Sequence, residues 1–236
     1  FNFLFKYPNA IIVNSFDLKK EIDKEFNIHS KCILNPFNKK KMLKYKKSKK
    51  NLFNVNKKTL KILFIGRLVD QKDPFTFIKA INDIPEQIKF KSLIIGSGYL
   101  KTDILKYIQD NNLKNKLSQL DYTENAMKYL NQCDLFVLSS KYEGLPNVLL
   151  EAQFLKKYII STNCPTGPRE ILLGGEAGDL IKTRSPEILK KKIIRFYANR
   201  SHKDYKKKIA LGYRKLNRFD FNDNCQKYLK LIKENI

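Results

Sequence analysis

Two glutamates, Glu143 and Glu151, flank the expected start of a helix in the stretch KYEGLPNVLLEAQ. Pro146 suits the first turn of that helix, because the N–H that proline lacks would be unpaired there in any case. Glu143 therefore precedes the helix, and Glu151 lies about one and a half turns inside it. A solvated helix face explains scattered acids, but it leaves this spacing around a Gly-Leu-Pro turn unexplained.

The start of this helix offers hydrogen-bond donors to a ligand. The backbone N–H groups expected to be free belong to Gly144, Leu145, Asn147 and Val148. Such groups, together with the helix dipole, can receive an anion or a sugar hydroxyl. The carboxylate of Glu151 only accepts hydrogen bonds and could hold the two hydroxyls of a ribose. The alternative is that Glu143 binds no ligand and is simply an acid that the helix dipole favours at this position.

A second loop, FIGRLVDQKDP, follows an apolar stretch and carries two cations. Gly66 allows a tight turn, and Arg67 and Lys72 then extend from the same loop. A guanidinium fork and an ammonium point charge together suit a diphosphate. The alternative is two surface cations in a lysine-rich protein.

A third loop, IIGSGYLK, has Gly96 and Gly98 between an expected strand and an expected helix. The dinucleotide fingerprint G-x-G-x-x-G would need a glycine where the chain has Lys101, so that fingerprint is not met. This loop by itself favours a tight strand-to-helix turn.

Short apolar stretches that alternate with helix-length segments must position these loops. The expected strands are residues 10–14, 31–35, 60–66, 92–96, 134–139, 158–162 and 178–181. Strands that are apolar throughout and separated by helices are typical of a parallel sheet covered on both faces. The sequence therefore predicts an α/β fold with a doubly wound, Rossmann-like parallel sheet. The lysine-rich run 39–51 is expected to be a loop or insertion, and the part after Ser185 is expected to be helical.

The composition excludes some classes of protein. With 236 residues, of which 42% are hydrophobic, the chain can fold around a core, and it has no apolar run long enough to span a membrane. The four cysteines form no C-x-x-C pair, which favours incidental thiols over zinc or disulfides. The net charge of +24 would attract nucleic acid, anionic lipid or polyanionic substrates, unless it reflects a compositional bias. The chain begins at Phe1 without a secretory signal, and we expect further sequence before it.

The loops, taken in order, resemble one family of enzymes. The segments GRLVDQKD, IIGSGYLK, SSKYEGLPNVLLEA, IISTNCPTGPREIL and GEAGDLI resemble the retaining GT-B glycosyltransferases of the group 1, family 4 type. Glu143 and Glu151 reproduce the E-x7-E spacing of that family. The resemblance covers roughly residues 10 to 185, and the order of the segments makes it specific.

This resemblance implies a role for each site residue. Glu143 would be the catalytic residue that faces the transferred sugar, Glu151 would bind the ribose, and Arg67, Lys72 and Gly66 would hold the donor diphosphate. Gly144, Leu145, Asn147 and Val148 would contact the sugar and phosphate. Gly98, Tyr99 and Tyr122 would lie near the base. The family generally works without a metal or other cofactor, and its cations neutralise the leaving diphosphate.

The same resemblance implies an organisation and a function. Residues 1–35 would end an N-terminal acceptor domain, 36–219 would bind the nucleotide sugar, and 220–236 would form a helix crossing back to the first domain. We expect transfer of a hexose or N-acetylhexosamine, with UDP as the nucleotide, to a glycan or lipid-linked acceptor in surface polysaccharide or glycolipid synthesis. This chain alone would be inactive.

We expect a cytoplasmic protein, peripheral on the inner face of an anionic membrane, with no nucleic acid as partner. The alternative is a basic α/β module without catalysis that binds nucleic acid or a membrane surface. Binding to nucleic acid would weaken steeply with salt. Aromatic residues do not interleave with the lysine runs, as a stacking platform for nucleic acid would require.

Overall fold

The computed structural model describes residues 7–47 and 51–235. The strands are β1 (Ile12–Val13), β2 (Lys31–Cys32), β3 (Leu60–Ile65), β4 (Phe90–Ile95), β5 (Leu117–Leu120), β6 (Leu135–Leu138), β7 (Tyr158–Thr162) and β8 (Asp179–Ile181). The α-helices are α1 (Phe16–Phe26), α2 (Lys39–Leu43), α3 (Pro74–Asn82), α4 (Lys101–Asp110), α5 (Ala126–Gln132), α6 (Asn147–Phe154), α7 (Pro168–Ile171), α8 (Pro186–Asn199), α9 (Lys203–Lys215) and α10 (Phe221–Lys233). Short 3-10 helices are η2 (Lys44–Lys47), η3 (Leu113–Asn115), η4 (Leu173–Gly175) and η5 (Leu216–Phe219).

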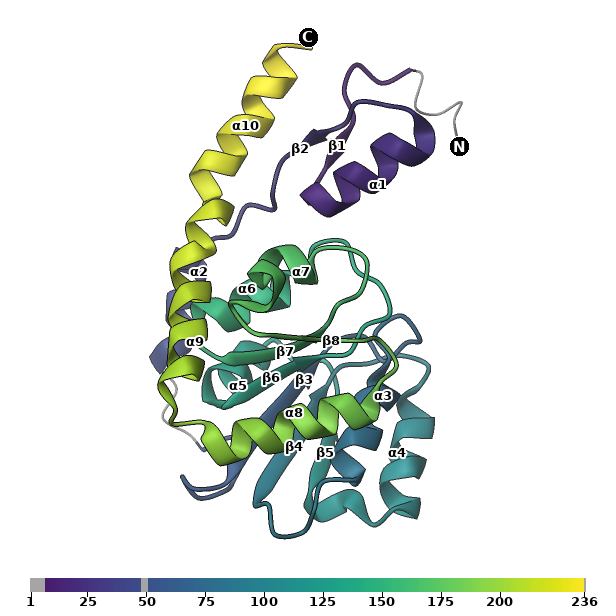
Figure 1. Cartoon of the computed structure of the whole chain (residues 1–236), viewed down its shortest axis with the longest axis vertical. Coiled ribbons are helices and arrows are strands. Elements are labelled where there is room, and N and C mark those ends of the chain that lie inside the picture. Colours follow the sequence, from purple (N-terminus) through teal and green to yellow (C-terminus); the bar gives the residue numbers. More distant parts are fainter. Residues whose placement is uncertain (1–6, 48–50, 236) are drawn as a thin grey trace.

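Six parallel strands form the main sheet, in the order β5-β4-β3-β6-β7-β8 (Figure 1). Successive residues of its central strands are buried on opposite faces. Leu63 packs with α5 and α6, whereas its neighbour Phe64 packs with α3 and α4. Two hydrophobic cores, one on each face, explain why these strands are apolar throughout. The predicted doubly wound α/β fold is confirmed.

The strand β5 lies at the edge of the sheet and was not predicted from the sequence. Its sequence is LSQL, and only Leu117 is fully buried. Because Ser118 and Gln119 stay half-buried at the edge, the stretch lacks the apolar run that identified the inner strands. The strand forms because its backbone pairs with β4 over four residues.

The lysine-rich run 39–51, expected to be a loop or insertion, is helical over residues 39–47, so a loop is the wrong description of this part. Asn38 caps α2 by accepting a hydrogen bond from Lys41 N at 3.0 Å. Met42 is buried in the same core as Phe37 and Phe53. A few apolar anchors therefore hold a segment whose other side chains are mostly lysines; residues 48–50 lie outside the described part.

Residues 7–35 form a small unit beside the sheet, with β1 and β2 paired in parallel and α1 packed on them (Figure 1). Ser15 caps α1, because its Oγ accepts a hydrogen bond from Leu18 N at 3.1 Å. Helix α10 begins after Asp220 and reaches this unit, where Asn9 Nδ2 donates to Asn235 O at 2.9 Å. The chain from Ser185 to the end of the described residues contains helices and no strand, as predicted.

Over residues 7–47 and 51–235, no helix is both long enough and apolar enough to cross a membrane.

Candidate functional site

Three loops meet at the carboxyl ends of β3, β4 and β6, where ligands bind in open parallel sheets. They are residues 66–73, 96–100 and 139–146, the three loops that the sequence singled out. A hydrogen bond from Ser139 Oγ to Asp73 O at 2.8 Å joins the first loop to the third. The sheet thus brings together groups that lie far apart in the sequence.

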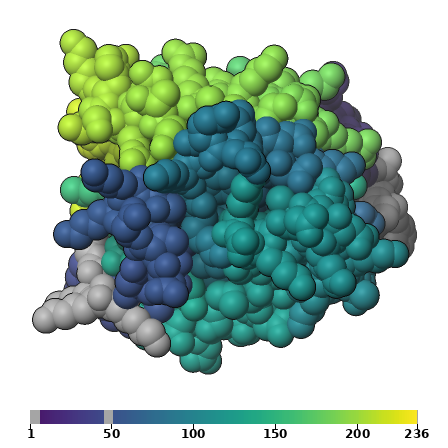
Figure 2. Space-filling model, turned by 90° about the horizontal axis from the view of Figure 1, so that it is seen from below, coloured from purple at the N-terminus to yellow at the C-terminus, as the bar shows by residue number. Residues whose placement is uncertain are grey.

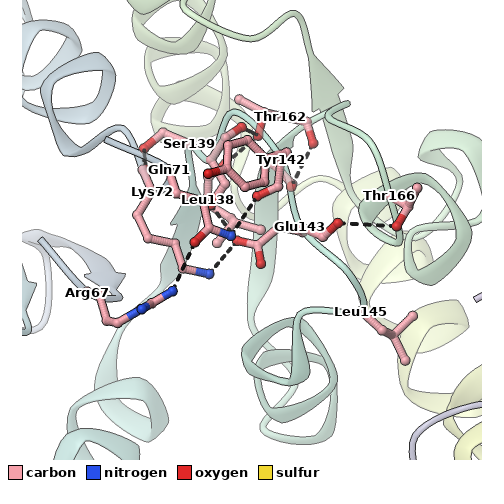
Figure 3. A network of polar contacts seen from close by, with 12 residues as sticks. Arg67, Gln71, Lys72, Leu138, Ser139, Tyr142, Glu143, Leu145, Thr162 and Thr166 are labelled. Atoms are coloured by element: carbon pink, nitrogen blue, oxygen red, sulfur yellow. Dashed lines mark hydrogen bonds and ion pairs between the residues drawn. The ribbon is translucent and has the colours of Figure 1, made fainter. Parts of the chain in front are cut away.

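Glu143 lies at the centre of a polar network (Figure 3). Its Oε1 accepts a hydrogen bond from Lys72 Nζ at 2.6 Å and another from Ser140 Oγ at 2.5 Å. The Glu143 side chain is 6% exposed and that of Lys72 17%, so this ion pair is shielded from bulk water. Oε2 accepts no hydrogen bond from any described residue, which leaves one carboxylate oxygen free for a ligand.

The loop after β7 fixes the backbone around Glu143. Glu143 N donates to Pro165 O at 2.6 Å, and Thr166 N donates to Glu143 O at 2.8 Å. Gly167 has a φ of +89°, and a Cβ there would lie 2.3 Å from Gly144 O. The segment CPTGPREIL therefore positions the Glu143 loop, and its glycine permits the close approach.

The predicted free amides do lie at a helix N-terminus. The N–H groups of Gly144, Leu145, Asn147 and Val148 donate to no acceptor among the described residues. Helix α6 begins at Asn147, with Pro146 just before it rather than in its first turn as predicted. These four donors and the positive end of the helix dipole lie beside Glu143.

Arg67 extends from the 66–73 loop and is exposed, with Nη2 3.0 Å from Gln71 Oε1. Gln71 in turn donates through Nε2 to Tyr142 O at 3.1 Å, so its amide links Arg67 to the Glu143 loop (Figure 3). Sequence reasoning missed Gln71, because a glutamine beside two cations gives no signal until the loops are placed together. Arg67 and Lys72 thus both extend from this loop, as expected, and their contact with a diphosphate stays a prediction.

A pocket of about 500 Å³ adjoins this network. It is lined by Tyr45, Ile65, Gly66, Arg67, Ile95, Gly96, Ser97, Tyr122, Thr123, Glu124, Ala126 and Met127. Tyr122, which the resemblance implied to lie near the base, lines this pocket, and its contact with a base stays a prediction. Tyr45 was missed, because the lysine run that contains it was interpreted as a loop.

Gly98 and Tyr99, expected near the base, are not among the lining residues. A Cβ at Gly98 would lie 2.3 Å from Leu68 O, and the Tyr99 hydroxyl donates to Asp70 Oδ2 at 2.8 Å. Gly96 is packed in the same way, since its Cβ would lie 1.9 Å from Gly66 O. Both glycines are therefore needed for the 66–73 and 96–100 loops to pack against each other. This agrees with the alternative that the IIGSGYLK loop is a tight strand-to-helix turn.

Glu151 lies on α6 and is half-buried. Burial raises the pKa of its carboxyl above the ordinary value, and the nearby Lys41 ammonium partly opposes this. Glu151 is not among the residues that line the pocket, and its contact with a ribose stays a prediction.

In the part of the chain that the structure describes, no cluster of three or more His, Cys, Asp or Glu side chains is arranged to hold a metal ion.

Residues 45–213 match the family described as "Glycosyl transferases group 1". An uncharacterized glycosyltransferase of Methanocaldococcus jannaschii is 34% identical over 178 residues, which are 73% of this chain and 44% of that protein. The N-acetylgalactosamine-N,N'-diacetylbacillosaminyl-diphospho-undecaprenol 4-alpha-N-acetylgalactosaminyltransferase of Campylobacter jejuni is 32% identical over 121 residues, 51% of this chain and 33% of that protein.

The crystal structure of a TarM point mutant of S. aureus, in complex with UDP among other ligands, superposes with a TM-score of 0.80 at 21% identity. The match covers 94% of this chain and 43% of that one, and at this identity it establishes the fold. The chain spans about half the length, or less, of these three proteins.

Proposed function

Because the chain belongs to the glycosyl transferases of group 1, we propose that it binds a nucleotide diphosphate sugar, with UDP as the nucleotide, and that its protein transfers the sugar with retention of configuration. The observation that carries the proposal is the arrangement around Glu143. A free carboxylate oxygen, a shielded lysine and four free amides lie together at the carboxyl ends of the strands.

In this proposal the diphosphate lies between Arg67, Lys72 and the α6 N-terminus. The guanidinium, the ammonium and the free amides supply the positive charge that stabilises the leaving diphosphate, without a metal ion or other cofactor. The sugar lies over Glu143, whose free Oε2 accepts a hydrogen bond from one of its hydroxyls. Before the donor arrives, the Glu143 carboxylate is paired with the Lys72 ammonium at 2.6 Å.

The nucleoside occupies the pocket between Gly66 and Tyr122. The pocket combines apolar walls, such as Ile65 and Met127, with loop backbone at the ends of β3 and β4, as small-ligand sites commonly do. Glu151, which lies on α6 outside the pocket lining, holds the ribose hydroxyls through its carboxylate oxygens.

The transferred group is a hexose or N-acetylhexosamine, and the acceptor is a glycan or a lipid-linked glycan of a surface polysaccharide or glycolipid. The name of the Campylobacter relative describes an undecaprenol-linked acceptor, which supports this choice. Such acceptors are anchored in lipid, so we place the protein peripherally on the inner face of the cytoplasmic membrane.

Binding of nucleoside diphosphates tests the proposal. UDP, GDP and ADP are compared by thermal unfolding, since a ligand at one hundred times its Kd adds about 2.7 kcal/mol of stability. We expect UDP to stabilise the protein. We also expect Lys72→Ala, together with Arg67→Ala, to weaken UDP binding more than UMP binding, because the cations face the diphosphate.

Lys79→Ala is the matched control, since Lys79 is an exposed lysine of α3. In the full-length protein, release of UDP from UDP-sugars in the presence of lipid-linked acceptor then measures transfer, and Glu143→Ala should abolish it. Failure of all three nucleotides to bind, or full activity of Glu143→Ala, would contradict the proposal.

A further inference from the structure

We propose that Asn14, on the small N-terminal unit, completes the sugar subsite and accepts a hydrogen bond from a hydroxyl of the donor sugar. This inference rests on the proposed function and extends it, because it assigns a substrate contact to the unit opposite Glu143. Asn14 directly follows β1 and had no role in the sequence analysis.

The side chain of Asn14 lies against the loop that carries Glu143. Its Nδ2 and Oδ1 atoms are each 3.8 Å from the position of a Cβ on Gly144. Gly144 is the residue after Glu143, and its amide is one of the free donors at the start of α6. The carboxamide therefore borders the space that the proposed sugar would occupy.

The Oδ1 atom of Asn14 is buried and has no hydrogen-bond partner among the described residues. An unpaired buried acceptor is costly, and such atoms are normally satisfied by a partner or a bound molecule. Three other side-chain atoms of the described residues share this property: Gln153 Oε1, Tyr158 OH and Glu170 Oε1. Asn14 is the one whose carboxamide lies within 4 Å of the Cβ position on Gly144, in the loop that carries Glu143.

Two hydrogen bonds hold the small N-terminal unit, and with it Asn14, in this position. Two residues further on, Phe16 N donates to Glu170 Oε2 of α7 at 2.8 Å. From the end of the small unit, Asn35 Nδ2 donates to Asn147 Oδ1 at 2.9 Å, at the first residue of α6. The small unit is thus fastened to the donor-binding part on both sides of the Glu143 loop. Because Oδ1 of Asn14 is buried, its contact with a ligand requires the carboxamide to turn toward that ligand.

The chemistry of Oδ1 identifies the part of the donor that it contacts. A carboxamide oxygen only accepts hydrogen bonds, and an ionised diphosphate also offers only acceptors, so these two groups do not pair. The hydroxyls of a sugar donate, and Glu143, one residue before Gly144, offers Oε2 as a second free acceptor. Asn14 and Glu143 would therefore bind two hydroxyls of the same sugar, while Arg67 and Lys72 bind the diphosphate.

Isothermal titration of Asn14→Ala tests the inference, with UDP, UDP-glucose, UDP-galactose, UDP-N-acetylglucosamine and UDP-N-acetylgalactosamine as probes. We expect the Kd of the sugar nucleotide that the wild type binds best to rise about five- to tenfold, as for loss of one hydrogen bond. The Kd of UDP should change by less than about twofold, because UDP carries no sugar to reach Asn14.

Asn9→Ala is the matched control, because Asn9 lies on the same unit, is exposed and donates to Asn235 O instead. It should change neither Kd. If Asn14→Ala changes neither the Kd of UDP nor the Kd of the sugar nucleotide, the inference is overturned and the proposed function stays intact. If both Kd values rise by the same factor, Asn14 supports the fold and not the sugar, which also overturns the inference. Absence of UDP binding by the wild type overturns the proposed function, and this inference with it.

Discussion

At the scale of single residues, the Lys72–Glu143 pair connects stability to chemistry. The ammonium and the carboxylate come from loops 71 residues apart and meet at 2.6 Å with little exposure to water. Each ion makes the burial of the other tolerable. In the free protein Lys72 neutralises Glu143, and the proposed diphosphate would supply a competing partner for the same ammonium.

Replacing Lys72 by methionine should lower the free energy of unfolding by about 2 kcal/mol, because it leaves the buried Glu143 carboxylate without its cation. Urea denaturation at pH 7 measures the change. The double variant K72M/E143Q should recover part of the loss, because no buried charge remains. Lys79→Met, at an exposed position, should stay within about 0.5 kcal/mol of the wild type. Equal effects of the two single lysine variants would contradict the account.

Glu151 predicts a dependence of stability on pH. Burial raises the pKa of its carboxyl in the folded protein. Above this raised pKa the folded state must hold a buried carboxylate, which lowers the free energy of unfolding. Below about 4.3, the pKa of a glutamate in the unfolded chain, the carboxyl is protonated in both states and this loss of stability is absent. Glu151→Gln should therefore be more stable than the wild type at pH 7, with the difference shrinking as the pH falls toward 4.

Unfolding of Glu151→Gln and wild type by urea at pH 7 and pH 4 measures this difference. The exposed Glu176→Gln is the control and should show no such trend. A Glu151→Gln variant that is less stable than the wild type at pH 7 would refute the prediction. If Glu151 holds the ribose, the stabilised variant should also bind UDP more weakly, as a functional residue retained at a cost in stability would.

At the scale of elements, the site depends on how closely two strand-to-helix loops approach each other. Gly96 allows the β4–α4 loop to pass over the carbonyl of Gly66 in the β3–α3 loop. The same contact forms the wall of the pocket between Gly66 and Gly96. Packing of the loops and the shape of the pocket therefore have one cause.

Gly96→Ala should lower the free energy of unfolding by about 3 kcal/mol, because its Cβ would lie 1.9 Å from Gly66 O and the two loops would have to separate. Gly66→Ala is the control from the opposite loop, since a Cβ there meets only ordinary contacts at 3.5 Å or more. It should change stability by less than about 0.5 kcal/mol. Urea denaturation of both variants measures the difference, and a mild effect at Gly96 would show that the loops can separate easily.

At the scale of the whole molecule, the net charge of +24 is spread unevenly. The exposed lysines 203, 206 and 207 lie along α9, and Lys191 lies on the neighbouring α8; we call these four the basic helix face. Figure 2 shows the residues of α8 and α9 gathered along the upper edge of the view. Because the proposed acceptor is linked to lipid, we propose that the basic helix face binds an anionic bilayer.

Flotation with phosphatidylglycerol vesicles tests this surface. We expect the protein to float with these vesicles at low salt, to be released at about 0.5 M salt, and to ignore phosphatidylcholine vesicles, since charge alone drives the binding. Reversing Lys203, Lys206 and Lys207 to glutamate should weaken binding at least about 100-fold, at about 1 kcal/mol for each lysine removed.

Reversal of Lys89, Lys106 and Lys114 changes the net charge equally and serves as the control, because these exposed lysines lie outside the basic helix face. If both triple variants lose binding to the same extent, the net charge attracts the vesicles and the basic helix face has no special role. Binding that resists high salt would argue for an apolar contact instead.

The sequence by itself determined the inner strands of the sheet and the loops at their ends, because both leave local signals. Inner strands buried on two faces must be apolar throughout, and loops at strand ends carry their glycines and charges in recognisable order. The loops that carry Glu143, Arg67 and Lys72 were therefore identified without any coordinates, and the roles of these residues stay predictions. The edge strand β5 was not, because half-buried Ser118 and Gln119 need not be apolar.

Only the tertiary structure decided which distant groups meet. The ion pair of Lys72 with Glu143, the link through Gln71, the wall at Tyr45 and the contact of Asn14 with Gly144 all join segments that are separate in the sequence. No local pattern records such contacts, because they depend on the order of the strands and on backbone approach at single glycines. For the same reason Tyr99, which the resemblance implied to lie near the base, instead donates a hydrogen bond to Asp70.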